Sequence, residues 1–210
     1  MSEQETEQKP VRRRLSWDER REEFIAQAIR FFADEGFESS TRELARRLGV
    51  TQPLLYRYFP SKDDLIAEVY EAVYLKRWND DWDALIVDQA RPLRERLIDF
   101  YESYTDVVFK RDWMRIFLFS GLKGVDINAR YMERVKSHVL LPILRECRRD
   151  AGLTDLEPSK AEVDYAWVMH GGIYYFGVRK QIYARQDVTE KSFVIRTSID
   201  AFLTHLPNVR

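Results

Sequence analysis

Two short helical segments joined by a glycine turn constrain the fold of this chain more than any other feature. The first segment carries three apolar residues at the spacing of one helix face: Leu44, Ala45 and Leu48. Thr41 is its predicted N-cap, and Gly49 follows it, where a left-handed residue commonly ends a helix. Because a second helix follows within a few residues, the segment predicts a helix-turn-helix unit.

The second segment, residues 52–58, has side chains suited to contact with DNA. Thr51 is expected to cap it, and Pro53 lies in its first turn, where a missing N–H costs nothing. So short a helix needs tertiary support, which Leu55 and Phe59 are expected to provide. Four side chains are expected to point outward, toward phosphates and base edges: Gln52, Leu54, Tyr56 and Arg57.

The residues after this segment predict a stop followed by a new helix. Pro60 disfavours helical geometry at Phe59, and Ser61 can cap the next helix together with Asp64. Lys62 lies in the first turn of that helix, where its ammonium group and the free N–H groups suit a phosphate.

The stretch from Phe24 to Leu65 resembles the DNA-binding domain of the TetR family of transcriptional regulators. Their signature of tyrosine-x-tyrosine/histidine-phenylalanine followed by serine-lysine matches five residues: Tyr56, Tyr58, Phe59, Ser61 and Lys62. The resemblance implies an all-α fold with an N-terminal three-helix helix-turn-helix DNA-binding domain followed by a helical ligand-binding and dimerisation domain. The residues expected to contact DNA are Arg13, Thr41, Arg42, Thr51, Gln52, Pro53, Leu54, Tyr56, Arg57, Tyr58 and Lys62.

Composition agrees with an all-α protein. The chain has 210 residues, 45% of them apolar, with helical periodicity and no sustained alternation. We divide it into a flexible basic-ended arm (1–15), the helix-turn-helix domain (16–62) and the ligand-binding and dimerisation domain (63–210). No apolar run approaches the roughly 20 residues that span a bilayer, the polar start is not a signal peptide, and the single Cys147 cannot form an internal disulfide. A cytoplasmic protein without membrane contact is therefore expected.

Basic charge is concentrated near the predicted reading helix although the formal net charge is −1. Within residues 41–62, Glu43 is the lone acid among five basic side chains: Arg42, Arg46, Arg47, Arg57 and Lys62. Such a patch is typical of a protein that binds nucleic acid with one end, although a solvated surface is the alternative. Arg13 lies in a basic run at 12–14, which could reach a minor groove or extend into solvent.

The rest of the chain predicts a series of helices. A capping box of Ser16 and Glu19 starts a helix that ends near Gly36, and a long helix is expected from Lys62 toward Trp82. Further helices are expected at 92–110, 113–122, 128–151, 159–184 and 189–206. Pro142 lies inside one of them and should bend it.

The last two predicted helices have the composition of an interface, with an ordinary core helix pair as the alternative. TetR-like proteins dimerise by pairing these helices into a four-helix bundle, so the resemblance implies a homodimer that reads adjacent major grooves of a palindromic double-stranded operator. The predicted interface residues are Ala166, Ile173, Gly177, Val194, Thr197, Ser198, Ala201 and Phe202.

Large aromatic residues in the middle helices either fill the core or line an apolar ligand pocket. The residues predicted to line it are Phe100, Tyr104, Trp113, Phe117, Trp167, His170 and Tyr174. His170 is the best polar candidate, with a structural histidine as the alternative.

Together these features predict a ligand-responsive homodimeric repressor, released from its operator by a small apolar or aromatic inducer. An activator of the same family is the alternative. An all-α enzyme using His170 with Asp164, or a dimeric module without DNA binding, fits the sequence less well. The three histidines and Cys147 show no metal-ligand spacing, so no metal, cofactor or catalytic residue is expected.

Overall fold

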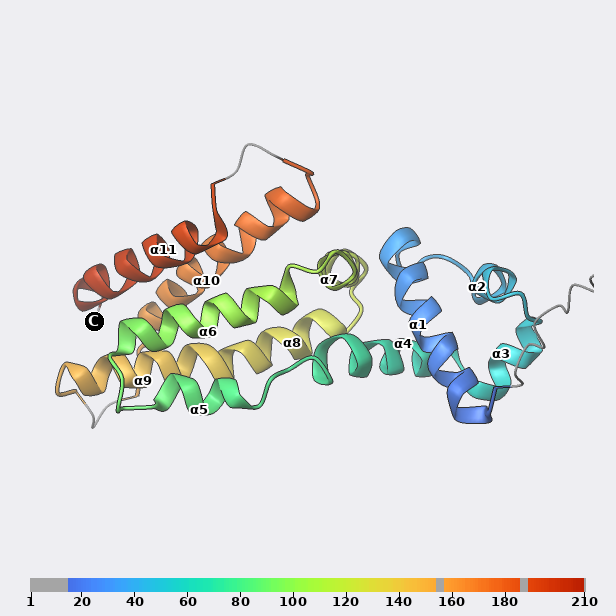
Figure 1. Ribbon diagram of the computed structural model, residues 1–210, viewed down its shortest axis with the longest axis horizontal. Coiled ribbons are helices and arrows are strands. Elements are labelled where there is room, and N and C mark those ends of the chain that lie inside the picture. The colour runs from blue at the N-terminus through green and yellow to red at the C-terminus, as the bar shows by residue number, and fades with distance from the viewer. Residues whose placement is uncertain (1–14, 154–156, 186–188, 210) are drawn as a thin grey trace, which may run out of the picture.

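A computed structural model describes residues 15–153, 157–185 and 189–209, and every regular element within them is helical. The molecule is elongated, with a small head formed by α1 to α3 and the start of α4 at one end, and a larger helical body at the other (Figure 1). Arg13 and most of the predicted arm lie outside the described residues. The predicted all-α class is confirmed.

The head is built from α1 (Trp17–Glu35), α2 (Thr41–Arg47) and α3 (Gln52–Tyr58). The predicted capping box starts α1: the Ser16 hydroxyl accepts from the Glu19 N–H at 3.2 Å, and the Glu19 carboxylate accepts from the Ser16 N–H at 2.8 Å. Gly36 ends α1 at a φ of 73°. The inner face of α1 buries seven apolar side chains: Phe24, Ile25, Ala28, Ile29, Phe31, Phe32 and Ala33.

The turn between α2 and α3 has the predicted glycine geometry. Gly49 has a φ of 66°, and the Val50 N–H bonds the Ala45 carbonyl at 3.0 Å, which satisfies the end of α2. The N-cap of α2 is Ser40 rather than Thr41, because the Ser40 hydroxyl accepts from the Glu43 N–H at 3.2 Å. Thr51 occupies the N-cap position of α3 but makes no side-chain capping bond.

The helix that leaves the head is shorter than predicted. α4 (Lys62–Tyr70) begins at the Ser61–Asp64 cap, continues as a π-helical turn at Glu71–Leu75 and then stops. Trp82 therefore does not extend this helix but belongs to α5 (Asp81–Val87). Its indole is 2% exposed and donates to the Ser103 hydroxyl at 3.0 Å, so the chain turns before Trp82 to bring that ring against α6.

The body is completed by longer helices. These are α6 (Leu93–Val108), α7 (Arg111–Lys123), α8 (Ile127–Val135), α9 (Leu141–Asp150), α10 (Lys160–Gln181) and α11 (Lys191–His205), with a 3-10 turn at Leu206–Asn208. α8 and α9 join through a π-helical turn at Lys136–Leu140. Pro142 thus falls in the first turn of α9 directly after this irregular turn, where its missing N–H is tolerated.

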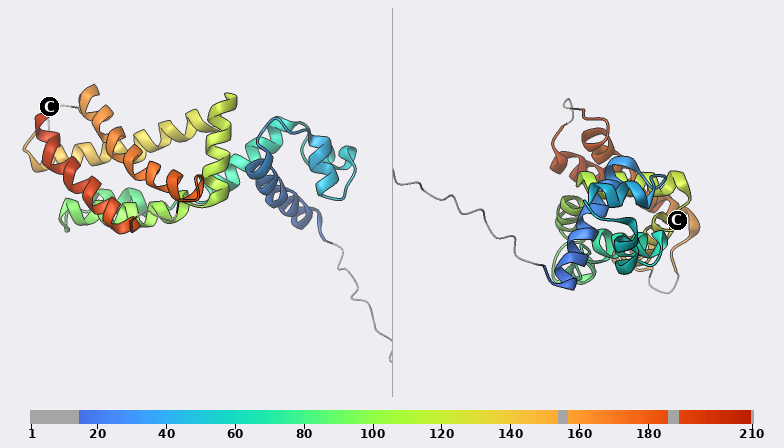
Figure 2. Two further views of the ribbon diagram at one scale, coloured as in Figure 1. Left: turned by 90° about the horizontal axis from the view of Figure 1, so that it is seen from above. Right: turned by 90° about the vertical axis from the view of Figure 1, so that its right-hand side faces the viewer.

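α7 runs across the long axis of the molecule, between the body and α1 of the head (Figure 2). The other body helices extend away from it and pack along one another. Among the described helices, none is long and apolar enough to cross a membrane. The buried residues of head and body form one continuous hydrophobic core.

Candidate DNA-binding surface and ligand cavity

α3 is fixed on the head by the two apolar residues predicted to hold it. Leu55 is 1% exposed and Phe59 is 2% exposed. The opposite side leaves Tyr56 and Arg57 in solvent, as predicted for a reading helix. The other two side chains predicted to point outward, Gln52 and Leu54, are half-buried. Thr51 and Pro53, which were also predicted to contact DNA, are exposed.

Thr41 packs between α2 and α3, where its hydroxyl contacts two side chains of α3, and does not face outward. Its side chain is buried, and its hydroxyl lies 2.9 Å from the Tyr56 hydroxyl. The Gln52 amide donates to the same Thr41 oxygen, also at 2.9 Å. Burial argues against the predicted direct contact of Thr41 with DNA, since its one hydroxyl already serves two residues. Its place in the structure is to orient Gln52 and Tyr56.

Two further predicted DNA contacts are engaged within the head. The Tyr58 ring stacks on Trp17, with centroids 3.8 Å apart, and meets the edge of Phe24 at 5.0 Å. The Lys62 ammonium donates to the backbone carbonyl of Phe37. These contacts join α3 to the first half of α1, and α4 to the loop that follows α1. Both side chains therefore already stabilise the head, and a phosphate would have to compete with these contacts.

The predicted basic patch is partly neutralised by acidic partners. Arg46 binds Glu43 through two bonds of 2.9 and 2.5 Å, and this hydrogen-bonded pairing lowers the pKa of the Glu43 carboxyl. Arg47 pairs with Glu35, an acid outside the segment from which the charge was counted. Arg42 and Arg57 are exposed and make no ion pair within the part of the chain that the structure describes.

An apolar cavity of about 190 Å³ lies between α6, α7, α8 and α10. Six of the seven residues predicted to line a ligand pocket line it: Tyr104, Trp113, Phe117, Trp167, His170 and Tyr174. The other lining residues are Tyr131, Met132, Val135 and Gly171. Phe100 is not among them, because its ring is fully buried and stacks on Tyr104 at 5.3 Å, beside Trp82.

The three α8 residues of this cavity were missed by sequence reasoning. Tyr131 and Val135 have the spacing of one helix face, but that spacing does not reveal which space the face borders. The Tyr131 ring packs against Trp113 at a centroid distance of 4.9 Å, a contact that depends on how α7 and α8 cross.

The side-chain nitrogen and oxygen atoms of the cavity residues belong to phenol, imidazole and indole groups. His170 Nδ1 lies 3.2 Å from the Tyr101 hydroxyl, and burial lowers the pKa of His170 to about 4, so the ring is neutral near pH 7. The Tyr104 and Tyr131 hydroxyls bond each other at 3.0 Å. The buried Tyr174 hydroxyl has no hydrogen-bond partner among the described residues, and burial raises its pKa.

The predicted dimer residues on α10 and α11 divide into two groups. Four are buried within the protomer and cannot form an outer face: Ala166, Ile173, Gly177 and Phe202. At Gly177 the ring of Phe109 occupies the space that a side chain would need. Thr197 and Ala201 are exposed, and Val194 and Ser198 are half-buried.

The same two helices expose large apolar side chains that the sequence analysis did not select. Val168 is 68% exposed, Tyr175 is 54% exposed, and Phe193 is 60% exposed. Val168 lines a groove between α10 and α11 together with Ser198 and Ala201, and exposed apolar groups of this kind are typical of a surface that another protein covers. With Thr197 and Ala201 they define what we call the α10–α11 face.

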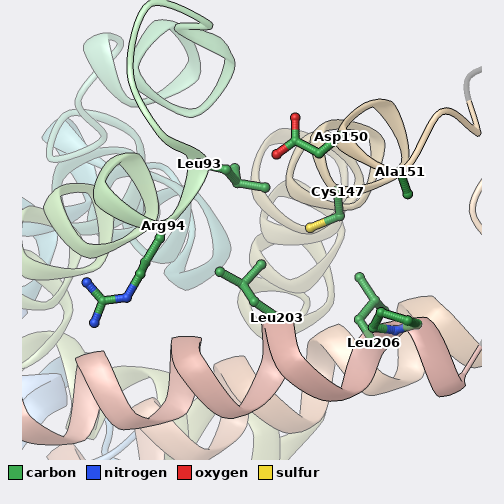
Figure 3. Close-up of a pocket in the computed structure, with 8 residues that line it drawn as sticks. Leu93, Arg94, Cys147, Asp150, Ala151, Leu203 and Leu206 are labelled. Atoms are coloured by element: carbon green, nitrogen blue, oxygen red, sulfur yellow. The ribbon is translucent and has the colours of Figure 1, made fainter.

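A second, more open groove of about 380 Å³ lies at the end of the body farthest from the head. Leu93, Cys147 and Leu203 converge on it, with Leu206 beside them (Figure 3). Arg94 stands at its edge, where its guanidinium pairs with Asp200 at 2.6 Å. The groove is mainly aliphatic and is separate from the aromatic cavity.

Comparison with known proteins agrees with the geometry of the head. Residues 24–69 match the family model described as bacterial regulatory proteins, tetR family. The chain is 37% identical to the tetracycline repressor protein class A from transposon 1721 of Escherichia coli, over 29% of this chain and 32% of that protein. It is 35% identical to the tetracycline repressor protein class C of Escherichia coli, over 38% of this chain and 40% of that protein. The matches thus span only about a third of the length of these curated relatives.

The fold of nearly the whole chain is found in solved structures. A TetR family transcriptional regulator from Pseudomonas syringae pv. tomato superposes with a TM-score of 0.62 and 22% identity, covering 90% of this chain and 97% of that one. A putative TetR-family regulator from Mesorhizobium loti gives a TM-score of 0.62 at 16% identity, covering 90% and 98%. At these identities the likeness concerns the fold, including the body that the family model does not reach.

Proposed function

Because its N-terminal domain matches the TetR family model and its fold resembles those of TetR-family regulators, we propose that this chain is a homodimeric, ligand-responsive DNA-binding regulator. The observation that carries the proposal is the exposed side of α3, on the part of the head that faces away from the body. There α3 presents Arg57 and Tyr56 outward, with Tyr56 and Gln52 oriented by the buried Thr41. A short helix held this rigidly can enter a major groove with fixed side-chain geometry.

The cavity and the head are connected through α7. Trp113 and Phe117 line the cavity. From the same helix Arg115 donates to the Ala33 carbonyl, and Arg111 pairs with Asp34 at 3.0 Å. A ligand that moves α7 would therefore move the C-terminal end of α1, and with it the head.

A second connection runs through the π-helical turn that follows α4. The Tyr74 hydroxyl donates to the Trp113 carbonyl at 3.1 Å, and the two rings lie 5.0 Å apart. A ligand changes DNA affinity only if it binds two arrangements of the protein differently. α7 and this turn are the elements through which we expect the cavity to favour one arrangement.

We propose repression over activation. The matched relatives are called tetracycline repressors, and repression requires only that the promoter be occupied. A match to DNA-binding regulators also supports a non-enzymatic role, so His170 is assigned no catalytic function. Binding of chromosomal DNA would place the protein in the bacterial cytoplasm.

Dimerisation through the α10–α11 face would supply the second head. A single short reading helix offers little affinity, whereas two related by a twofold axis can bind half-sites about 34 to 36 Å apart. The exposed Val168, Tyr175 and Phe193 side chains would be covered in such a dimer.

Selection of bound duplexes from a random DNA pool tests the proposal. We expect the full chain to enrich a palindrome with half-sites about one helical turn apart, and to bind it with strong salt dependence. Arg57→Ala should weaken the enrichment at one position of each half-site, as expected for the loss of one base contact. Binding without any sequence preference, or recovery of a single half-site, would contradict the proposed dimeric regulator.

A further inference from the structure

We infer that the aromatic cavity takes an uncharged, single-ring aromatic molecule bearing a hydroxyl or carbonyl oxygen, and that the Tyr174 hydroxyl binds that oxygen. The inference rests on the proposed ligand-binding role of the cavity and goes further by stating the chemical class of the ligand.

The first argument is the unsatisfied hydroxyl of Tyr174. A buried polar atom without a partner costs free energy, and native proteins contain few of them. Tyr174 lies within ring-contact distance of Trp113 and Phe117, at 6.3 and 5.8 Å, so it forms part of the same wall. A ligand oxygen is the group that would give this hydroxyl a partner.

The second argument is that the other phenol hydroxyls at the cavity already have hydrogen-bond partners. The Tyr104 and Tyr131 hydroxyls satisfy each other, and the Tyr74 hydroxyl is used by the Trp113 carbonyl. The pKa values of the Tyr74 and Tyr104 phenols are raised, mainly by burial and to a smaller extent by the nearby Tyr174 phenol. The Tyr131 and Tyr174 rings both pack against Trp113 and Phe117, so Tyr174 belongs to the same group of phenols. The other phenols of this group have made their hydrogen bonds, and the Tyr174 hydroxyl is left to bind a ligand.

The third argument is charge. None of the residues that line the cavity carries a charge at neutral pH, because His170 is neutral there. The nearby cations of α8 are directed elsewhere: Arg130 lies over the Tyr70 ring at 4.1 Å, and Arg134 over the Trp78 ring at 4.6 Å. An anionic ligand would lose its hydration without gaining a counter-ion. The cavity thus selects against carboxylates.

The fourth argument is size. A dry cavity of about 150 Å³ is known to bind benzene, and drug-sized ligands need roughly 300 Å³ or more. The cavity here measures about 190 Å³, which suits one ring with small substituents. Trp113 and Phe117 stack on each other at a centroid distance of 5.1 Å, and both line the cavity, so an aromatic ligand would meet aromatic groups there.

The test is calorimetric titration of the full chain, without DNA, with three probes that share one ring: toluene, para-cresol and para-toluate. We expect para-cresol to bind most tightly and para-toluate at least about tenfold more weakly, because the anion must be desolvated. Tyr174→Phe should weaken para-cresol about 3- to 10-fold and change toluene less than about twofold, as expected for loss of one hydrogen bond.

Tyr183→Phe is the matched control, because Tyr183 lies directly after α10, is 58% exposed and belongs neither to the cavity nor to the α10–α11 face. It should leave the affinity for all three probes unchanged. Equal binding of toluene and para-cresol, equal losses for both in Tyr174→Phe, tight binding of para-toluate, or no binding of any probe at millimolar concentration would each overturn the inference.

Operator binding, measured separately, distinguishes this inference from the proposed function. If para-cresol binds through Tyr174 but never alters operator affinity, the ligand class holds and the regulatory role fails. If the protein binds DNA selectively but the three probes give one of the contradicting results named above, the proposed regulatory function is supported and the inferred ligand class is wrong.

Discussion

Arg57 is the residue that we expect to contribute most to the choice of DNA sequence. It is exposed on α3 and pairs with no acid among the described residues, so its guanidinium is available for a base edge. Arg57→Ala should cost about 1 to 3 kcal/mol on the preferred operator and relax the preference at one position. Fluorescence anisotropy with operators altered one base pair at a time measures this effect.

Arg42 provides the comparison, because it is also exposed but lies on α2. Arg42→Ala should weaken all duplexes alike and lower the salt dependence by about one counterion. If both variants lost affinity equally on every sequence, the division into a base contact and a phosphate contact would be wrong.

A pH-dependent stability is expected from His170. Its pKa is lowered from 6.5 to about 4 by burial, so as the pH falls through this window the unfolded chain takes up a proton that the folded protein excludes. Stability should therefore fall with the pH, by about 2 kcal/mol between pH 7 and pH 5 for this one group. Urea denaturation at the two pH values, for the wild type and for His170→Gln, measures the difference. An identical pH dependence in both proteins would exclude His170 as the source.

The sequence predicts residue roles best where the partners are close along the chain. The Ser16–Glu19 and Ser61–Asp64 caps join residues three positions apart and were predicted correctly. Thr41 and Lys62 were assigned to DNA, but their observed partners Tyr56 and Phe37 lie 15 and 25 positions away. A polar side chain beside a reading helix looks the same in sequence whether it faces DNA or a neighbouring helix.

At the scale of elements, α7 is the helix that we expect to link ligand to head. Arg115 contacts the Ala33 and Asp34 carbonyls from the helix that also carries Trp113 and Phe117. Arg115→Ala should leave ligand affinity in the DNA-free protein nearly unchanged. It should reduce the ligand-induced change in operator affinity, which for a coupling of 1 to 3 kcal/mol is about 5- to 150-fold in the wild type.

Operator titrations with and without a ligand that releases the wild type measure this coupling. Arg145→Ala is the control, since Arg145 is on α9, away from the head, and forms an exposed ion pair with Glu157 in the loop before α10. Full ligand response in Arg115→Ala would show that the signal does not pass through this contact.

Helix positions were predictable from apolar periodicity, but helix ends and outer faces were only partly so. α4 stops at its π-helical turn because Trp82 is needed against α6, a partner that the local sequence does not reveal. On α10 the small residues Ala166 and Gly177 suggested an outer contact. They are instead covered from within the protomer, where Phe109 packs over Gly177.

At the scale of the whole molecule, the α10–α11 face should hold two protomers together. Val168→Glu would place a carboxylate in the proposed contact, and burial of an unpaired charge should cost several kcal/mol and separate the dimer. Because Val168 is 68% exposed in the protomer, the variant should still fold. Phe202 is unsuitable for this test because its ring lies in the protomer core.

Light scattering at micromolar concentration measures the outcome. Leu122→Glu is the control, because Leu122 is 80% exposed and belongs to α7, outside the α10–α11 face. A wild type that is monomeric, or a Val168→Glu variant that stays dimeric, would exclude this face as the interface.

The contact between α7 and α1 limits which segments can be exchanged between related proteins of this fold. Arg111 and Lys123 pair with Asp34 and Glu38 near the end of α1, while the Phe119 ring lies against Gly36, where an added Cβ would come within 3.3 Å. A foreign head joined to this body would bring different side chains to all of these positions. We therefore expect the transplantable unit to be the head together with the outer side of α7. A chimera cut after the helix-turn-helix should keep the DNA specificity of the foreign head but lose the response to the ligand of the body.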